Sequence, residues 1–475
     1  MFSDHSLPDH HLATYRTVLY CTIMATDPIG TLRSFRAGLY GSLTGWADTL
    51  FELCDAVVCS PTAVHSVPSL SLEPVFRRGH GSLYKALDRG GIDTDRLRRL
   101  LVAHLPDPGG GPRVFAVDAS TWDRCDAETS PERGFYYSAS KHSAGQPIVA
   151  GWNYQWITQL CFTPDSWTAP ADVTRIPPAD THTGATVTQI RQLVTLLPDS
   201  QVAPMFVFDA GYDPIAIGHD LAEINAQILC RIRDDRVFHA SPPPHPNRPP
   251  STGGRPPRHG PRFSCADPTS WPQPTATLTT HDPRYGTITV TAWAELHPRL
   301  GCRGHWKHHT TPPIVTGTVI RVDVEHLPRP VARAHKTLWL WWSGPGTPDL
   351  DQCWRSYLRR FDIEHTFRFA KNTLGWTTPS VRTPDQADRW TWLIAAAYTQ
   401  LRLARPLVHD RRLPWERPLT TSQLTPHRVR RGFRALAATL GTPANPPQPS
   451  RAGPGRPKGT RRPPRTRYPA LKKTG

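Results

Sequence analysis

The chain has 475 residues, a formal net charge of +17, 52 prolines and 16 tryptophans, and only 20% of its residues are charged. Hydrophobic residues make up 38% of the sequence, which excludes a wholly disordered basic protein, and no run of 18 apolar residues predicts a membrane span. Of the 56 basic residues 48 are Arg, whose planar side chain matches phosphate, so the composition favours a polyanionic partner or reflects a GC-rich genome.

The first unit, residues 31–105, is predicted to be helical. Apolar residues between Phe35 and Val57 recur at steps of three and four, which is typical of one face of a single helix. Shorter helices are expected at 82–87 and 95–104. This pair is either a helix-turn-helix or, as we favour, an ordinary helical hairpin with a solvated basic face. The first alternative would place three cations on DNA: Arg96, Arg98 and Arg99.

From residue 113 onward the pattern changes to that of strands alternating with helices. Strands are predicted at 114–117, within 147–162 as a pair, at 205–208 and at 228–232, with helices at 184–197 and 215–224. Short apolar strands in this order favour a mixed α/β sheet covered by helices. Two of the strands run directly into a carboxylate, Asp118 and Asp209. We therefore expect both at strand ends, where open α/β sheets place their sites.

Residues 241–274 are rich in Pro, Gly, His and Arg, which predicts an exposed linker or loop. Strand patterns return at 286–293, 314–324 and 337–342, so 236–343 is interpreted as a β-rich insertion. Five tryptophans of this insertion either pack in its core, as we favour, or stack on a displaced base: Trp293, Trp306, Trp339, Trp341 and Trp342. Four further residues form either a zinc site or, as we favour, a His-rich loop: Cys302, His305, His308 and His309.

Three helices are predicted near the C-terminus, at 351–374, 387–403 and 425–440. The tail, residues 443–475, contains nine Lys or Arg and no acid, about half of the net charge. Within it, the segment around Arg456 and Lys458 is similar to the Gly-Arg-Pro core of AT-hook peptides, which enter the minor groove. A purely electrostatic tail that binds phosphates without specificity is the alternative that we favour.

One stripe of the expected helix 351–374 carries charged and polar side chains. At about 100° per residue its members fall within an arc of about 80°: Tyr357, Arg360, Glu364, Arg368 and Lys371. Apolar residues flank the stripe on both sides: Trp354, Leu358, Phe361 and Phe369 on one, Ile363, Phe367, Ala370 and Leu374 on the other. A solvated face is bordered by polar residues, so this pattern indicates a carboxylate that acts on a metal or phosphate, among cations that hold an anionic backbone.

At these residues the sequence resembles the bacterial insertion-sequence transposases of the DDE type, whose catalytic domain is RNase H-like. One branch carries the signature Y-x2-R-x3-E-x6-K, which is matched at every spacing by Tyr357, Arg360, Glu364 and Lys371. The segment from Asp209 to Tyr212 resembles the D-x-G-[FY] motif of the second Asp, and 114–120 resembles the first-Asp strand. Three further acids lie near Asp118: Asp123, Asp126 and Glu128. We favour Asp118 as the first Asp because of its expected position at the end of a strand.

The resemblance implies that Asp118, Asp209 and Glu364 are the catalytic, metal-binding triad, with two Mg²⁺ ions as cofactor and Mn²⁺ as a substitute. Water would cut at the ends of the element, and the freed 3′-hydroxyl would attack target DNA. Six residues are expected to contact DNA: Tyr357, Arg360, Arg368, Lys371, Arg456 and Lys458. The implied partners are double-stranded transposon-end and target DNA, and a second copy of the chain, since the resemblance suggests at least a homodimer.

The expected fold is an α/β, RNase H-like mixed sheet flanked by helices and interrupted by a β-rich insertion, with an N-terminal helical region and a disordered basic tail. The expected boundaries are 1–105 for the helical, candidate DNA-binding region, 106–235 and 344–442 for the two parts of the catalytic domain, 236–343 for the linker and insertion, and 443–475 for the tail. Two other functions stay open: an inactivated or domesticated DNA-binding relative, and a non-transposing nuclease of the same fold.

The cysteines and the N-terminus predict the compartment. The nine cysteines are odd in number and include no CxxC pair, which is unlike a disulfide framework. Residues 1–30 lack a basic start followed by an apolar run. We therefore expect a cytoplasmic, nucleoid-associated protein without a membrane partner.

Overall fold

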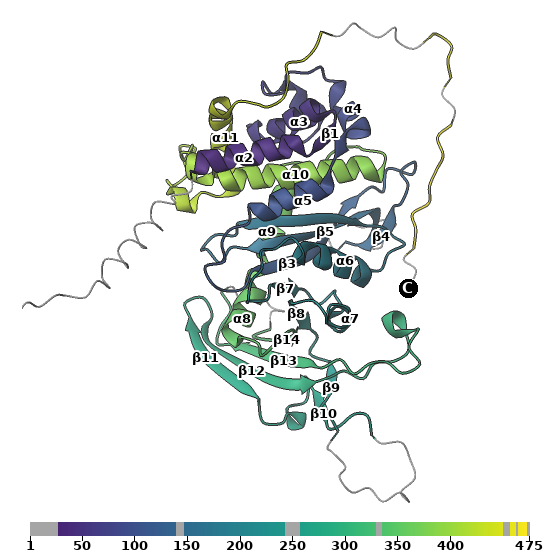
Figure 1. Cartoon of the computed structure of the whole chain (residues 1–475), viewed down its shortest axis with the longest axis vertical. Coiled ribbons are helices and arrows are strands. Elements are labelled where there is room, and N and C mark those ends of the chain that lie inside the picture. Colours follow the sequence, from purple (N-terminus) through teal and green to yellow (C-terminus); the bar gives the residue numbers. More distant parts are fainter. Residues whose placement is uncertain are drawn as a thin grey trace, which may run out of the picture.

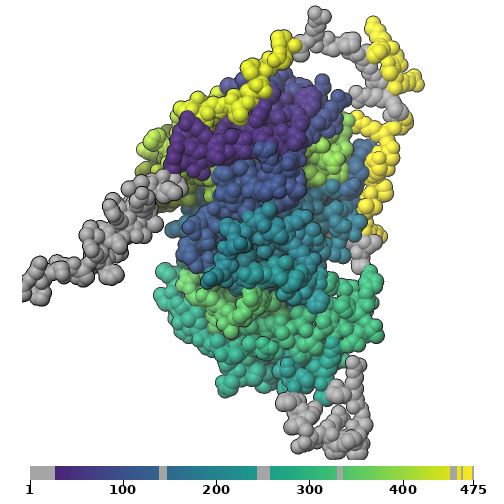
Figure 2. All heavy atoms as spheres, in the orientation of Figure 1, coloured from purple at the N-terminus to yellow at the C-terminus, as the bar shows by residue number. Residues whose placement is uncertain are grey.

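The structure is a computed structural model of the whole chain, and it describes residues 27–138, 147–242, 257–328, 335–449, 457–461 and 464–472. Helices from the N-terminal and C-terminal parts of the chain form a layer at one end of the molecule, and the strands of residues 276–343 lie at the other end (Figures 1 and 2). Within the described ranges, no helix combines the length and the apolar character that crossing a membrane requires.

A mixed β-sheet of ten strands runs between these two ends, as far as the described residues define it. Six of its strands come from the middle of the chain: β3 (Val114–Asp123), β4 (Gly134–Tyr137), β5 (Ile148–Leu160), β6 (Thr168–Ile176), β7 (Met205–Phe208) and β8 (Gln227–Ile232). Strands β3, β5 and β6 are antiparallel neighbours, whereas β7 and β8 continue the sheet beyond β3 in parallel. This order confirms the predicted mixed sheet and is the one expected of an RNase H-like fold.

Both faces of β3 are covered, which explains why its first half is a continuous apolar run. Because side chains alternate along a strand, Val114 and Ala116 join the core beneath the helical layer, and Phe115 and Val117 join the core on the opposite face. That opposite face is covered by α6 (His182–Val194) and α7 (Pro214–Asp220). The two faces therefore have different partners, and the even-numbered side chains of β3 face the helical layer.

The helical layer has α10 (Pro384–Ala404) at its centre, packed against β6. Around α10 lie five helices: α2 (Pro28–Gly41), α3 (Ala47–Cys59), α4 (Ser82–Arg89), α5 (Thr94–Ala103) and α11 (Pro426–Leu440). The prediction of one helix through Phe35 and Val57 is wrong. The chain breaks between α2 and α3, because β1 (Leu43–Gly45) pairs with β2 (Gly91–Ile92) and Trp46 adopts a left-handed φ of 54°.

Two buried ion pairs tie the N-terminal helices to the rest of the molecule. Arg36 on α2 contacts Asp55 on α3 at 2.6 Å and also donates to Gln400 on α10 at 2.7 Å. Arg98 on α5 contacts Asp172 on β6 at 2.9 Å. Arg98 is only 8% exposed, so it is a packing residue and the helix-turn-helix alternative, which placed it on DNA, is wrong at this position.

The β-rich insertion continues the central sheet. Its four strands follow β8 in antiparallel order, from β14 (Thr337–Ser343) through β13 (Gly317–Val324) and β12 (Gly286–Leu296) to β11 (Ala276–Asp282). A separate two-stranded ribbon is formed by β9 (Val237–His239) and β10 (Arg262–Ser264). The five tryptophans considered for base stacking are all at most 5% exposed, so they are core residues, as favoured.

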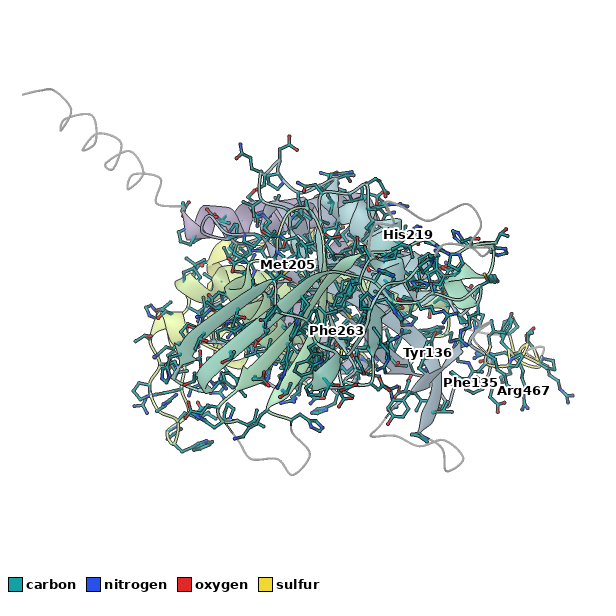
Figure 3. All side chains as sticks on the ribbon, turned by 90° about the horizontal axis from the view of Figure 1, so that it is seen from below. Phe135, Tyr136, Met205, His219, Phe263 and Arg467 are labelled. Carbon is teal, nitrogen blue, oxygen red and sulfur yellow. The ribbon has the colours of Figure 1, made fainter. Side chains whose placement is uncertain are left out.

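Part of the tail is ordered, which corrects the prediction that it is disordered. Tyr468 donates its backbone N–H to the carbonyl oxygen of Glu128 at 2.8 Å, and Leu471 donates to that of Arg133 at 2.7 Å. Leu471 forms a parallel bridge with Gly134, the first residue of β4. Figure 3 shows Arg467 beside the strand that carries Phe135 and Tyr136. The end of the tail thus satisfies backbone groups near the β4 edge, an outcome that composition does not reveal.

Candidate active site

Asp118 and Asp209 lie opposite each other because of the register between β3 and β7. The parallel pairing ends with Ala116 opposite Val207, and each carboxylate lies two residues further along its chain. The alternation of side chains then directs both carboxylates toward the helical layer, the side that Ala116 and Val207 face. The expectation that Asp118 ends its strand is wrong, since β3 continues to Asp123 through its pairing with β5. What ends before Asp118 is the pairing with β7.

The segment that follows β7 holds Asp209 in place. The backbone N–H of Gly211 donates to Asp209 Oδ1 at 2.8 Å, and a Cβ at position 211 would come within 3.1 Å of that same oxygen. Tyr212 packs against Phe208 and donates its hydroxyl to Gln155 Oε1 at 3.0 Å. Glycine therefore allows the backbone to approach the carboxylate closely, and the tyrosine anchors the turn in the core.

The helix expected at 351–374 is two helices, α8 (Leu350–Arg359) and α9 (Asp362–Asn372). At the junction, Ile363 donates its N–H to Arg360 at 3.2 Å and Glu364 donates to Phe361 at 3.1 Å, so the chain turns more tightly than an α-helix. Phe361, predicted as part of an apolar flank, is 52% exposed. The single continuous stripe is therefore wrong, and Glu364 lies in the first turn of α9.

Arg360 lies at this junction, among the three predicted carboxylates. Its Nη1 is 3.2 Å from Asp118 Oδ2. Burial acts against its charge, but Asp118, and to a lesser degree Tyr357, Asp209 and Glu364, outweigh burial and raise the pKa of Arg360. The charges of all three acids thus act on one guanidinium, although 91 and 155 positions separate the acids in the sequence.

The neighbouring charges change the pKa of Asp118. Burial, followed by the charges of Asp209 and Glu364, raises the pKa of Asp118 to about 7, although Arg360 and the backbone N–H of Ala119 act in the opposite direction. The charges of Asp118, Asp209 and Glu364 together exceed that of Arg360, so the group carries an excess of negative charge. Oxygen donors with a net negative charge suit a hard divalent cation such as Mg²⁺, so the donor type of these residues fits the metal that the resemblance implies.

The cations of the expected stripe are spread over two helices. Tyr357, half-buried on α8, lies beside Arg360 with the guanidinium 5.9 Å from its ring centroid, and burial raises the pKa of its hydroxyl. Lys371 donates from Nζ to the carbonyl oxygen of Thr121 at 3.1 Å, further along β3. Arg368 is exposed on α9. Tyr357 and Arg360 thus lie near the acids, whereas Lys371 and Arg368 lie further along the same helical surface.

The remaining acids near Asp118 do not face the cluster. Asp123 points to the opposite face of β3, because it is an odd number of positions from Asp118. Asp126 contacts Arg124 at 3.2 Å, and Glu128 contacts Arg467 at 3.4 Å. In the tail, Lys458 is exposed, and Arg456 lies outside the described residues.

One residue near the site was missed by the sequence reasoning. Arg231 on β8 hydrogen-bonds to Tyr357 and lowers the pKa of its hydroxyl, against the larger effect of burial. A signal was present, since Arg231 is a lone cation within the apolar strand Gln227–Ile232. Alternation along that strand places it on the same side as Leu229, which belongs to the core beneath the helical layer.

The structure does not bring Cys302, His305, His308 and His309 together as one site. The Cys302 thiol contacts the carbonyl oxygen of Thr310 at 3.7 Å, and His305 faces Asp220 at the end of α7. The zinc site made of these four residues, which was the less favoured alternative, is therefore wrong.

Residues 38–299, more than half of the chain, match the family described as DDE superfamily endonuclease. The match includes Asp118 and Asp209 and ends before Glu364. Among solved structures, the chain is similar to one from "Cryo-EM structure of piggyBac transposase synaptic complex with hairpin DNA", with a TM-score of 0.41 and 10% identity, covering 83% of this chain and 72% of that one. None of the curated proteins matches the sequence.

Proposed function

This chain belongs to the DDE superfamily endonucleases, and from that premise we propose that it is the transposase of a bacterial insertion sequence. It would cut DNA at the ends of the element with the help of divalent metal ions and join the new ends to target DNA. The observation that carries the proposal is the ion pair between Arg360 and Asp118 at 3.2 Å, on which the charges of Asp209 and Glu364 also act.

The proposed chemistry has two steps at one site. Water attacks the phosphodiester at the end of the element, which leaves a 3′-hydroxyl on one side of the cut and a 5′-phosphate on the other side of the same strand. The 3′-hydroxyl then attacks a phosphodiester of the target, forms the new bond and releases a target 3′-hydroxyl. Mg²⁺, or Mn²⁺ in its place, would stabilise the charge on the phosphate and lower the barrier to attack by an oxygen nucleophile.

The residues of the chain would divide the work between them. Asp118, Asp209 and Glu364 would hold the metal through their oxygens, which is the ligand type that Mg²⁺ prefers. Arg360, whose Nη1 is 3.2 Å from Asp118 Oδ2, would bind a phosphate oxygen once the metal balances the charge of Asp118. Tyr357 would position Arg360, against which it lies.

The other proposed DNA contacts lie outside the carboxylate cluster. Lys371 and Arg368 would follow the backbone along α9. Lys458 and Arg456 would add contacts to phosphates or to the minor groove from the tail. A homodimer or a larger assembly would hold the two ends of the element together.

A cleavage assay with matched variants tests the site. DNA duplexes that carry the inverted repeats flanking the gene are incubated with the full chain and Mg²⁺. We expect Asp118→Asn, Asp209→Asn and Glu364→Gln each to slow cleavage by at least about 100-fold. Asp126→Asn and Glu128→Gln, which change acids outside the cluster, should cut within about twofold of the unmodified chain, because exposed groups away from a site contribute little. Cleavage by Glu364→Gln at the normal rate would contradict the assignment.

A strand-transfer assay distinguishes the proposal from its two rivals. Pre-cut ends with a free 3′-hydroxyl are mixed with a supercoiled target, and joined products are counted. A transposase forms them, a nuclease of the same fold cuts without joining, and an inactivated relative binds the ends but does neither. Inverted repeats and a short target duplication around the gene would independently support transposition.

A further inference from the structure

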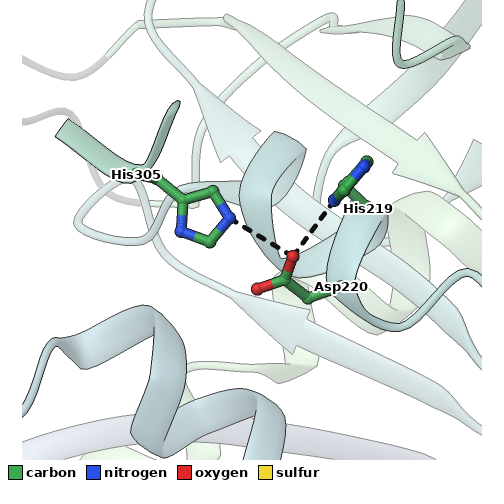
Figure 4. A group of neighbouring side chains, drawn as sticks. All are labelled: His219, Asp220 and His305. Carbon is green, nitrogen blue, oxygen red and sulfur yellow. Dashed lines mark hydrogen bonds and ion pairs between the residues drawn. The ribbon is translucent and has the colours of Figure 1, made fainter. Parts of the chain in front are cut away.

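A second polar cluster lies away from the carboxylates, where α7 meets a loop of the insertion. His219 and Asp220 are the last two residues of α7, and His305 lies in the short helix Gly304–Trp306 between β12 and β13. His219 Nδ1 is 3.1 Å from Asp220 Oδ1, and His305 Nε2 is 3.2 Å from the same oxygen. Figure 4 shows both rings turned toward this carboxylate from opposite sides.

The three donor atoms have the spacing of a metal site. One ligand atom from each residue lies within 4.8 Å of the other two. Zinc bonds of about 2.0–2.1 Å in tetrahedral geometry place neighbouring donors about 3.3 Å apart. The two distances to Asp220 Oδ1 are close to that value, so an ion could bind with small movements of the side chains.

Neighbouring side chains pack against the rings of His219 and His305 but do not bury the cluster. Trp306, only 5% exposed, meets the ring of His219 edge-on at 5.0 Å and that of His305 at 4.7 Å. The side chains of His219, Asp220 and His305 keep 36%, 26% and 29% of their surface exposed, so the cluster is open to solvent. Arg191 donates to the backbone oxygen of Asp220, but the carboxylate of Glu223 is paired with the same guanidinium at 2.5 Å and balances its charge.

We propose that His219, Asp220 and His305 bind one zinc-type divalent cation, with water in the fourth position. Two imidazoles and one carboxylate suit Zn²⁺, whereas the all-oxygen set of Asp118, Asp209 and Glu364 suits Mg²⁺. The two sites therefore take different ions.

The proposed ion would act as a clamp between two parts of the fold. Positions 220 and 305 are 85 residues apart, and the ion would fasten the loop after β12 to α7. Helix α7 begins shortly after the turn that holds Asp209, so the clamp would fix the insertion relative to the strand and turn that carry this acid.

Zinc binding by the full, tag-free chain tests the proposal. The protein is stripped with a chelator and titrated with Zn²⁺ against a chromophoric competitor, with millimolar Mg²⁺ present to occupy the carboxylates. We expect one Zn²⁺ per chain. His219→Ala and His305→Ala should each weaken this binding by at least about tenfold, as loss of a supporting residue already does in other metal sites.

Matched controls locate the ion. His308→Ala and Cys302→Ser change nearby residues that the proposed site does not use, and both should bind Zn²⁺ like the unmodified chain. Glu364→Gln should also retain it, which separates this site from the carboxylates. Loss of zinc in Cys302→Ser or Glu364→Gln, normal binding by His219→Ala and His305→Ala, or no binding by the unmodified chain would each overturn the proposal.

A thermal measurement guards against variants that merely misfold. Without metal, His305→Ala should melt within a degree or so of the unmodified chain, because His305 lies in a partly exposed loop. Added Zn²⁺ should raise the melting temperature of the unmodified chain and leave that of His305→Ala unchanged, because only the protein that binds the ion gains stability from it. An equal rise in both would contradict the site.

Discussion

Buried acids occur in the helical layer and in the candidate active site, but they are neutralised differently. Asp55 on α3 and Asp172 on the adjoining strand β6 each have their own arginine from the helical layer, at 2.6 and 2.9 Å. Burial raises the pKa of both acids, and their arginine partners lower it. At Asp118 the charges of Asp209 and Glu364 add to the effect of burial, and the one arginine in contact, Arg360, opposes all three effects. Balanced pairs hold a fold together, whereas an unbalanced cluster retains negative charge for a cation.

The largest effect on stability should come from breaking a balanced pair. Arg36→Met leaves Asp55 buried without its cation and is expected to lower the free energy of unfolding by about 3–5 kcal/mol. Denaturant titration measures the loss. The control is Arg96→Met, at an exposed position of α5, which should change the same quantity by less than about 0.5 kcal/mol. Similar losses in both variants would show that the buried pair of Arg36 and Asp55 is not important for stability.

Removing an acid from the unbalanced cluster should have the opposite sign. In a chelator at pH 8, Asp118→Asn is expected to raise the free energy of unfolding by about 1–2 kcal/mol, because a buried, crowded carboxylate is no longer ionised there. The pKa of Asp118 is about 7 in the folded chain and lower in the unfolded chain, so its ionisation penalises folding increasingly as the pH rises from about 4 to 7. The advantage of the variant should grow over that window and level off above it. A variant that is less stable at pH 8 would refute the unbalanced cluster.

Magnesium should compensate for the same excess of charge. At a concentration ten times its dissociation constant, Mg²⁺ is expected to stabilise the unmodified chain by about 1.4 kcal/mol, since it binds the folded state. Melting with and without Mg²⁺ measures the shift. Glu364→Gln should respond less, and Arg96→Met should respond normally. A response of Glu364→Gln equal to that of the unmodified chain would place the ion elsewhere.

The smallest effect is expected at the surface. Arg467→Ala removes a contact with Glu128 at 3.4 Å in which the two side chains are 81% and 64% exposed. Solvent screens such pairs, so the free energy of unfolding should change by less than about 0.5 kcal/mol. The same denaturant titration checks this, and a loss like that of Arg36→Met would mean that the tail contributes to the core.

Local patterns predicted the parts of the site that local forces determine. The apolar runs before Asp118 and Asp209 are strands because both faces of the sheet are covered. The spacing from Tyr357 to Lys371 identified the region of Glu364. It could not reveal the turn at Arg360, since residues of ordinary helix propensity occupy the break and the tertiary structure decides it.

Contacts between residues that are distant in the sequence could not be predicted for a different reason. No local sequence pattern around Arg98 predicts its buried ion pair with Asp172, and none around His305 predicts its contact with Asp220. The strands of the insertion were largely predicted, but their attachment to β8 was not, because strand patterns specify which side chains are buried and not which edge accepts them.

Because of the turn between α8 and α9, the signature residues lie on two helices that pack against different strands. Helix α8, with Tyr357, packs against β7, β8 and the outer strands β11 and β12, whereas α9, with Glu364, packs against β3 and β6. Arg360 lies in the turn that connects the two helices. The positions of Tyr357 and Glu364 therefore depend on different strands, and a change in the angle between α8 and α9 at Arg360 would alter the distance between these two side chains.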